Sequence, residues 1–138
     1  LQFVDTINGR TFYNNSKATN VPATITALKA FHDPVLLIAG GLDRGLSFDD
    51  LVPYLKENVN GVISYGETAE KIAMVAKKGE VEFIKTTETL DEAVQIAYEV
   101  SQRGDVILLS PACTSWDQFK TFEERGERFV SLVKKLAM

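Results

Sequence analysis

The sequence predicts a single α/β domain, a three-layer Rossmann-like fold with a mostly parallel sheet flanked by helices and an N-terminal β-hairpin. Stretches that are apolar throughout, such as PVLLIAGG and DVILLS, alternate with amphipathic stretches of helical length. Strands without a polar face are typical of a parallel sheet that is covered on both sides. The pair Asn8-Gly9, between two short extended segments, is a strong hairpin signal because both residues tolerate positive φ.

The first half of the chain carries local signals for helix starts. Asn20 suits the N-cap of a helix, and Pro22 suits its first turn. Pro53 belongs either in the first turn of the next helix or at a kink within it. The expected elements, in order, are a hairpin over residues 3–16, a helix over 20–31, a strand over 34–41 and a helix over 46–58.

The second half continues the alternation of strands and helices. Gly79 and Gly104 are expected to end two of the helices, and Thr89 followed by Glu92 forms a capping-box pattern. We see no linker or repeat, so residues 1–138 are expected to form one domain. The expected elements are strands over 61–66, 81–86 and 105–110, and helices over 67–79, 89–104 and 122–137.

Composition and charge exclude several classes of protein. The chain has 138 residues, of which 45% are hydrophobic and 25% charged, with a net charge of −4. Acidic and basic residues are interspersed, whereas nucleic-acid surfaces show a basic stripe. No apolar stretch approaches the roughly 20 residues that cross a bilayer. One cysteine, Cys113, cannot form an internal disulfide. We therefore expect a cytoplasmic protein without nucleic-acid or membrane partners.

The loops after the strands are the expected ligand site, because open α/β sheets bind ligands at the carboxyl ends of their strands. The loop NNSKATN, residues 14–20, places Lys17 and the Thr19 hydroxyl at a helix start, which attracts anions. The alternative for this loop is an elaborate helix cap. The loop GGLDRG, residues 40–45, brings Arg44, whose guanidinium suits a carboxylate or phosphate. The alternative there is a flexible turn with Asp43 and Arg44 paired in solvent.

The third polar loop is SPACTSWDQF, residues 110–119. It supplies the Thr114 and Ser115 hydroxyls and the start of a helix. The only histidine, His32, is expected at the opposite edge of the sheet, so Cys113 lacks a base and is interpreted as a buried residue rather than a nucleophile. The loops after the other two parallel strands offer few such groups. The polar loops together predict a rim that binds a small dianion but has little with which to perform chemistry.

The motifs NSKATN, GGLDRG and SPACTSWDQFKTFEERGERF, in that order, closely resemble the C-terminal domain of the Mur ligases, in particular the members that add D-glutamate. The resemblance covers nearly the whole chain. It implies a three-domain cytoplasmic enzyme of peptidoglycan precursor synthesis, and an N-terminal and a central domain are expected to lie outside this chain, which begins at Leu1 rather than a methionine. It also implies an ATP- and Mg²⁺-dependent ligase that adds D-glutamate to UDP-N-acetylmuramoyl-L-alanine through an acyl phosphate.

The resemblance also implies roles for individual residues. The family's D-glutamate contacts fall on Thr19, Arg44, Ser115 and Phe122, the last through its backbone amide, and the family's ATP contacts fall on Asn15 and Lys17. Arg44 stands where some members have lysine, and Asn15 departs from the usual aspartate. No catalytic residue, metal or cofactor is expected on this domain alone, which should be inactive by itself.

Two other interpretations remain open at this point. The chain is alternatively a free-standing α/β module that binds a small anion, or an interaction domain whose polar loops only cap helices. If the loops only cap helices, replacing Arg44 or Ser115 by alanine leaves ligand binding unchanged.

Overall fold

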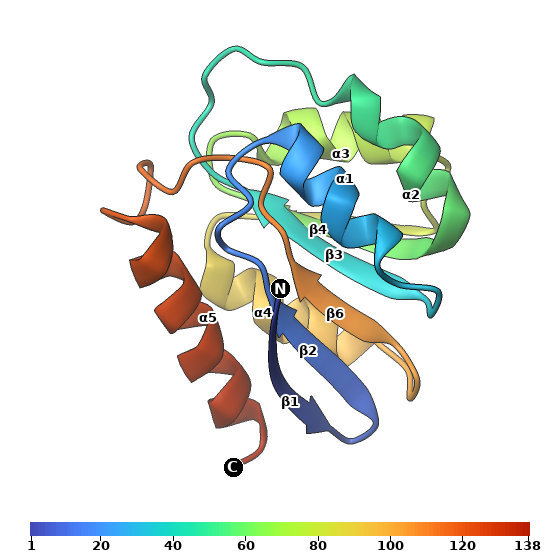
Figure 1. Cartoon of the computed structure of the whole chain (residues 1–138), viewed down its shortest axis with the longest axis vertical. Coiled ribbons are helices and arrows are strands. Elements are labelled where there is room, and N and C mark those ends of the chain that lie inside the picture. The colour runs from blue at the N-terminus through green and yellow to red at the C-terminus, as the bar shows by residue number, and fades with distance from the viewer.

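The structure, a computed structural model, describes residues 1–138. Helices and strands alternate after an initial pair of strands, as the sequence predicts (Figure 1). The elements are β1 (Gln2–Ile7), β2 (Arg10–Asn14), α1 (Val21–Lys29), β3 (Val35–Gly40), a short 3-10 turn η1 (Asp49–Leu51), α2 (Val52–Asn58), β4 (Val59–Tyr65), α3 (Ala69–Lys78), β5 (Phe83–Thr87), α4 (Leu90–Val100), β6 (Val106–Leu109) and α5 (Phe122–Leu136).

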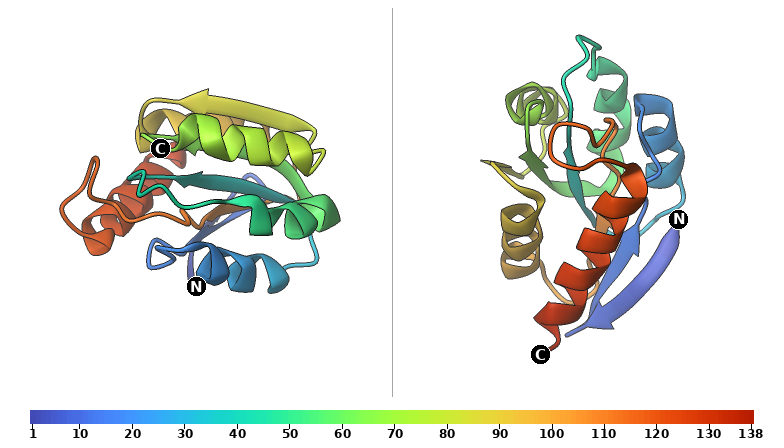
Figure 2. Two further views of the ribbon diagram at one scale, coloured as in Figure 1. Left: turned by 90° about the horizontal axis from the view of Figure 1, so that it is seen from above. Right: turned by 90° about the vertical axis from the view of Figure 1, so that its left-hand side faces the viewer.

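One six-stranded sheet organises the domain, with strand order β1-β2-β6-β3-β4-β5. Strand β1 pairs with β2 antiparallel, and every other neighbouring pair is parallel. Helices α1, α2 and α3 cover one face, and α4 and α5 cover the other (Figures 1 and 2). The predicted three-layer fold with an N-terminal hairpin is confirmed.

The central strand β3 explains why its sequence has no polar face. All of its residues are buried, and they alternate between two hydrophobic clusters. Val35, Leu37 and Ala39 face α1 to α3, whereas Leu36 and Ile38 face α4 and α5. The strand therefore contributes to the hydrophobic core on both faces of the sheet.

The local signals in the sequence are mostly confirmed. Asn8 and Gly9 form the hairpin turn with φ of 49° and 81°. The Asn20 side chain accepts a hydrogen bond from the Ala23 amide at 2.9 Å and caps α1. Thr89 caps α4, and Pro53 lies in the first turn of α2 without kinking it. These signals depend only on neighbouring residues, which is why the sequence reveals them.

The predicted end of the helix over 89–104 was wrong. Helix α4 ends at Val100, and Gly104, with φ of 96°, lies in the turn that follows. The reason is a contact between distant parts of the chain. Arg10 donates hydrogen bonds to the Ser101 hydroxyl at 3.0 Å and to the Ser101 carbonyl at 2.8 Å. This contact holds Ser101 in an extended conformation.

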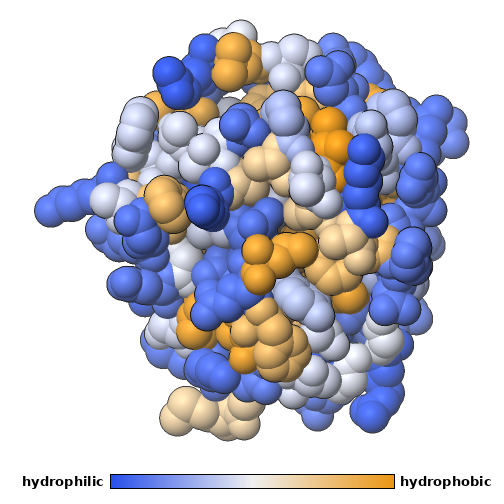
Figure 3. All heavy atoms as spheres, viewed as in Figure 1, coloured by the Kyte–Doolittle hydropathy of each residue, from blue (hydrophilic) through white to orange (hydrophobic).

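The face shown in Figure 3 is mostly hydrophilic at its rim, and hydrophobic residues gather across its middle. An aromatic row crosses the hairpin, where the ring of Tyr13 lies 5.9 Å from that of Phe3 and 4.9 Å from that of Phe31. None of the helices combines the length and the apolar composition that a membrane span requires.

Candidate functional site

The polar loops converge at the edge of the sheet where the parallel strands end (Figure 1). We name each loop after the strand that it follows. The loops are the β2 loop (residues 15–20), the β3 loop (41–48), the β4 loop (66–68), the β5 loop (88–89) and the β6 loop (110–121). The three loops that the sequence singled out, after β2, β6 and β3, follow strands that are neighbours in the sheet.

Arg125, in the first turns of α5, holds two of these loops together. Its side chain is 0% exposed. The guanidinium donates to the Ser16 hydroxyl at 2.9 Å, to the Ser16 carbonyl at 2.6 Å and to the Cys113 carbonyl at 2.9 Å. The Ser16 hydroxyl in turn donates to the Phe122 carbonyl at 2.7 Å. The β2 loop, the β6 loop and the start of α5 therefore form one hydrogen-bonded unit.

This buried cation has no carboxylate partner, because all three of its hydrogen bonds go to neutral oxygen atoms. Burial lowers the pKa of Arg125 and raises the pKa of the neighbouring Tyr65, whose hydroxyl is buried and has no hydrogen-bond partner. A buried charge is costly unless its surroundings compensate for it. In Arg125 this compensation comes from hydrogen bonds to neutral oxygen atoms rather than from a bonded carboxylate.

Arg44 and Thr19 line one pocket, of about 390 Å³, between the β2, β3 and β6 loops. Arg44 is exposed and forms no ion pair, because the carboxylate of Asp43 binds Lys71 instead, at 2.8 Å. The hydrogen bond from Lys71 lowers the pKa of Asp43. The alternative interpretation of this loop, an Asp43–Arg44 pair, is absent, so the guanidinium is available to bind a ligand carboxylate.

Asn15, Lys17 and Phe122 line a second depression, of about 610 Å³, on the other side of the β2 loop. Lys17 is exposed and pairs with no carboxylate, and the Asn15 amide donates to the Ser110 hydroxyl at 3.2 Å. Phe122 is the first residue of α5, where a backbone amide has no partner within the helix. Five of the six predicted site residues thus lie in two adjacent depressions, and both depressions are lined in part by the β2 loop.

Ser115 lines neither depression. It is 2% exposed, and its hydroxyl has no hydrogen-bond partner. Its carbonyl accepts from the amides of Gln118 at 3.1 Å and Phe119 at 2.8 Å, so Ser115 begins a tight turn. The next residue, Trp116, is 62% exposed at the tip of the β6 loop. A buried hydroxyl without a partner is rare in folded proteins and is a group that a ligand or water would satisfy.

Cys113 is buried, as the sequence predicted. Burial raises the pKa of its thiol to about 11, and its sulfur lies 3.4 Å from the Thr68 hydroxyl. His32 lies before β3, at the opposite edge of the sheet. The thiol is therefore protonated at neutral pH and has no base nearby. No three His, Cys, Asp or Glu side chains are close enough together to hold a metal ion.

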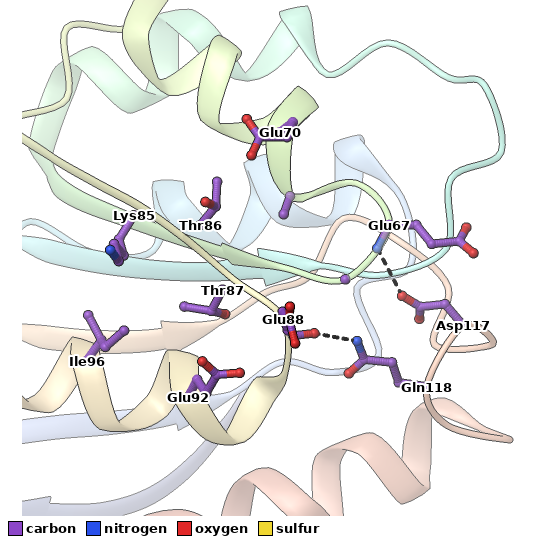
Figure 4. A pocket seen from close by; sticks show the side chains of 12 residues that line it. Glu67, Glu70, Lys85, Thr86, Thr87, Glu88, Glu92, Ile96, Asp117 and Gln118 are labelled. Atoms are coloured by element: carbon purple, nitrogen blue, oxygen red, sulfur yellow. Dashed lines mark hydrogen bonds between the residues drawn. The ribbon is translucent and has the colours of Figure 1, made fainter.

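A third depression, of about 730 Å³, lies beside the β4 and β5 loops (Figure 4). Its walls carry several carboxylates and one cation, Lys85. Asp117 of the β6 loop accepts from the Glu67 amide at 3.3 Å, and Gln118 donates to the Glu88 carbonyl at 2.7 Å. These hydrogen bonds tie the β6 loop to the β4 and β5 loops, which the sequence analysis had set aside.

Arg125 is the group that the sequence analysis missed most clearly. Its signal is the spacing of α5, where Arg125 precedes the buried Phe129 and Val133 by four and eight residues. Residues at this spacing share one face of a helix, so an arginine there is directed at the core. The contacts of Glu67 and Asp117 had no comparable signal, because they join segments that are about 50 residues apart.

Comparison with known proteins places the chain in a family. A model described as the Mur ligase, glutamate ligase domain matches residues 1–113. The chain belongs to the Mur ligase family. The resemblance seen in the sequence motifs is thereby confirmed.

Two curated relatives of this Mur ligase domain come from Bacillus species. It is 58% identical over 136 residues to the UDP-N-acetylmuramoylalanine–D-glutamate ligase of Bacillus cereus (strain B4264). It is 60% identical over 136 residues to the enzyme of the same name from Bacillus thuringiensis (strain Al Hakam). Each alignment covers 99% of this chain but 30% of the relative, so the chain spans less than a third of the relatives' length.

Solved structures of Mur ligases share the fold. A crystallised ligase domain from Haemophilus ducreyi superposes with a TM-score of 0.57 at 19% identity, over 95% of this chain and 97% of that domain. A UDP-N-acetylmuramoyl-L-alanyl-D-glutamate–2,6-diaminopimelate ligase superposes with a TM-score of 0.58 at 20% identity, over 87% of this chain and 27% of that enzyme. At these identities the likeness shows the fold alone.

Proposed function

We propose that this Mur ligase domain binds D-glutamate within a longer ligase that adds D-glutamate to UDP-N-acetylmuramoyl-L-alanine. The observation that carries the proposal is the unpaired Arg44 beside Thr19 in the pocket between the β2, β3 and β6 loops. This pocket occurs in a chain that is 58% identical to enzymes named as D-glutamate ligases. An exposed guanidinium without a protein partner suits a ligand carboxylate, which it binds through two parallel hydrogen bonds.

D-glutamate offers two carboxylates, and the loops offer a donor set for each. Arg44 and the Thr19 hydroxyl bind one carboxylate in the proposed complex. The Ser115 hydroxyl, which lacks a partner, and the Phe122 amide at the start of α5 bind the other. The buried charge of Arg125 adds attraction for both carboxylates without touching them. The domain contributes by holding the amine in position, which lowers the entropic part of the barrier.

The nucleotide contacts belong to the same proposal. Lys17, an exposed cation without a partner, suits a phosphate of ATP, and the Asn15 amide suits a neutral hydroxyl. ATP supplies the phosphoryl group that converts the muramoyl-alanine carboxylate into an acyl phosphate. Because this chain has no cluster of metal-ligating side chains, the ligands of Mg²⁺ are proposed to come from the rest of the polypeptide. The domain alone is proposed to be inactive, and the whole enzyme to serve peptidoglycan precursor synthesis in the cytoplasm.

The test is a kinetic assay of the full-length ligase that carries this domain. Phosphate release is measured against the concentrations of D-glutamate and L-glutamate, with UDP-N-acetylmuramoyl-L-alanine and ATP saturating. We expect turnover with D-glutamate, and we expect Arg44→Met to raise the KM for D-glutamate roughly 100-fold, since a charge-assisted bidentate contact is lost. The KM of Arg44→Lys for D-glutamate should lie between that of the wild type and that of Arg44→Met.

A matched control is Arg103→Met, which removes an exposed arginine from the turn between α4 and β6, at the opposite edge of the sheet. It should leave the KM for D-glutamate unchanged. Equal turnover of the two glutamate enantiomers, or an unchanged KM in Arg44→Met, would refute the proposal.

A further inference from the structure

The β4 loop, Gly66–Thr68, lies against both loops that carry proposed D-glutamate contacts. It follows β4, which lies between β3 and β5 in the sheet, and it contacts the β3 loop with Arg44 and the β6 loop with Ser115. Figure 4 shows Glu67 beside Asp117 of the β6 loop, joined by a hydrogen bond. The β4 loop contains none of the proposed ligand contacts, so its bonds to both loops need another explanation.

Thr68 makes the buried half of this connection. It is 0% exposed. Its amide and its hydroxyl both donate to the Gly41 carbonyl of the β3 loop, at 3.2 and 3.3 Å. The hydroxyl also lies 3.4 Å from the Cys113 sulfur of the β6 loop. One side chain therefore touches both loops at their bases.

Glu67 makes the outer half of the connection. Its carboxylate accepts from the Asp43 amide at 3.0 Å, next to Arg44. Its own amide donates to the Asp117 carboxylate at 3.3 Å, two residues beyond Ser115. Asp117 packs directly on Gly66, since a Cβ at Gly66 would lie 2.5 Å from the Asp117 carboxylate oxygen. The β4 loop thus contacts the residues that flank the proposed ligand contacts.

The β3 and β6 loops also touch each other, but only near the sheet. Gly40 donates to the Pro111 carbonyl at 3.1 Å, and Leu42 donates to the Thr114 carbonyl at 3.1 Å. Beyond Leu42 and Thr114, no direct hydrogen bond joins the two loops. The outer segments, with Arg44 and Ser115, are connected through Glu67.

We propose that Glu67 and Thr68 are positioning residues that set the spacing between Arg44 and Ser115, and with it the length of the amino dicarboxylate that the site accepts. This inference rests on the proposed function. D-aspartate is one methylene shorter than D-glutamate and carries the same charges. A fixed spacing discriminates between the two, whereas loops that move independently accommodate both.

The first experiment measures kcat and KM for D-glutamate and D-aspartate in the full-length ligase. Glu67→Ala removes the acceptor for the Asp43 amide, and Glu67→Gln keeps an oxygen acceptor there. The matched control is Glu70→Ala, because Glu70 is exposed in the same depression and points away from Glu67 (Figure 4). We expect Glu67→Ala to raise the KM for D-glutamate roughly fivefold, as the loss of one hydrogen bond implies, with kcat unchanged and a smaller preference over D-aspartate.

Glu67→Gln should restore the KM, and Glu70→Ala should match the wild type. Equal KM values in Glu67→Ala and Glu70→Ala would overturn the proposal. So would a loss of kcat without a change in KM, because a positioning residue acts on binding of the dicarboxylate.

The second experiment does not depend on the substrate. Amide shifts of the ¹⁵N-labelled 138-residue chain are compared for wild type, Glu67→Ala, Thr68→Val and Thr68→Ser. Both Glu67→Ala and Thr68→Val should change the amide chemical shifts of Arg44 and Ser115. Thr68→Ser, which keeps the hydroxyl, should leave these chemical shifts unchanged. Unchanged amides in Glu67→Ala would overturn the proposed connection even if Thr68→Val failed to fold. If the variants change the amide chemical shifts but the full-length ligase does not use D-glutamate, the proposed function is refuted, whereas the proposed connection through Glu67 and Thr68 is supported.

Discussion

Replacing Arg125 by methionine tests how the ligand-binding edge is built. Methionine has nearly the same length and shape as the arginine stem, so the change removes the guanidinium with little change in packing. It deletes three hydrogen bonds to Ser16 and Cys113. Because Arg125 is 0% exposed, water does not replace them directly.

The expected loss of stability follows from these contacts. A hydrogen bond from a charged donor contributes about 1.5–3 kcal/mol, and a buried carbonyl left without a partner costs about 1–3 kcal/mol. Opposing this, the folded protein no longer has to bury a charge, which recovers several kcal/mol. The balance is a destabilisation of about 3 kcal/mol. Arg125→Lys keeps the charge but not the planar set of donors, so it should fall between methionine and the wild type.

The assay is urea unfolding of the 138-residue chain, followed by circular dichroism. With an m-value of about 2 kcal/mol per molar urea, a loss of about 3 kcal/mol lowers the midpoint by about 1.5 M. The control is Arg128→Met, on the same helix, where the arginine is exposed and pairs with Asp91. An exposed ion pair contributes little, so the control midpoint should stay close to that of the wild type.

Two outcomes would contradict a stabilising role for Arg125. If Arg125→Met unfolds at the same urea concentration as Arg128→Met, the buried hydrogen bonds do not stabilise the fold. If Arg125→Met is more stable than the wild type, the cost of burying the charge exceeds the value of its bonds, and Arg125 is retained for ligand attraction alone.

Three further predictions concern the same edge. Gly41→Ala should destabilise the fold by about 2–4 kcal/mol in urea unfolding, because the added Cβ would lie 2.4 Å from the Thr114 carbonyl oxygen. Gly45→Ala, where φ is positive but the surrounding space is open, should cost roughly 1 kcal/mol. Cys113, whose thiol pKa is raised to about 11, should react with iodoacetamide far more slowly at pH 8 in the folded chain than in urea, and equal rates would contradict its burial. Burial raises the pKa of Asp117 above its value of roughly 4 in the unfolded chain. The contribution of Asp117 to the free energy of unfolding is therefore greatest below this unfolded pKa and falls as the pH rises through the folded pKa. The stability of Asp117→Asn relative to the wild type, measured by unfolding, should therefore rise between pH 3 and 7.

The elements of the fold were predictable because their signals are local. The hairpin at Asn8-Gly9, the caps at Asn20 and Thr89 and the all-apolar β3 each depend on a few neighbouring residues. The end of α4 was not predictable in this way. Gly104 is a reasonable helix terminator, but the helix ends at Val100 because Arg10, 91 residues earlier, binds Ser101.

In the candidate site, too, local motifs were predictable and contacts between distant residues were not. The sequence motifs identified the loops that carry Lys17, Arg44 and Ser115, and the structure brings these loops to one edge of the sheet. The sequence did not reveal that Arg125 lies buried beneath them or that Glu67 bonds both the β3 loop and the β6 loop. These contacts depend on strand order, which places β6 between β2 and β3, and no local pattern encodes that order.

Whether this domain holds D-glutamate is best determined by titrating the ¹⁵N-labelled chain. The titrants are the D-glutamyl reaction product of the ligase and its L-glutamyl epimer, and amide shifts are followed for both. If the domain holds D-glutamate, the amide resonances of Thr19, Arg44, Ser115 and Phe122 shift, and they shift further with the D-glutamyl product. Shifts elsewhere on the domain, or equal shifts with both epimers, would contradict this prediction.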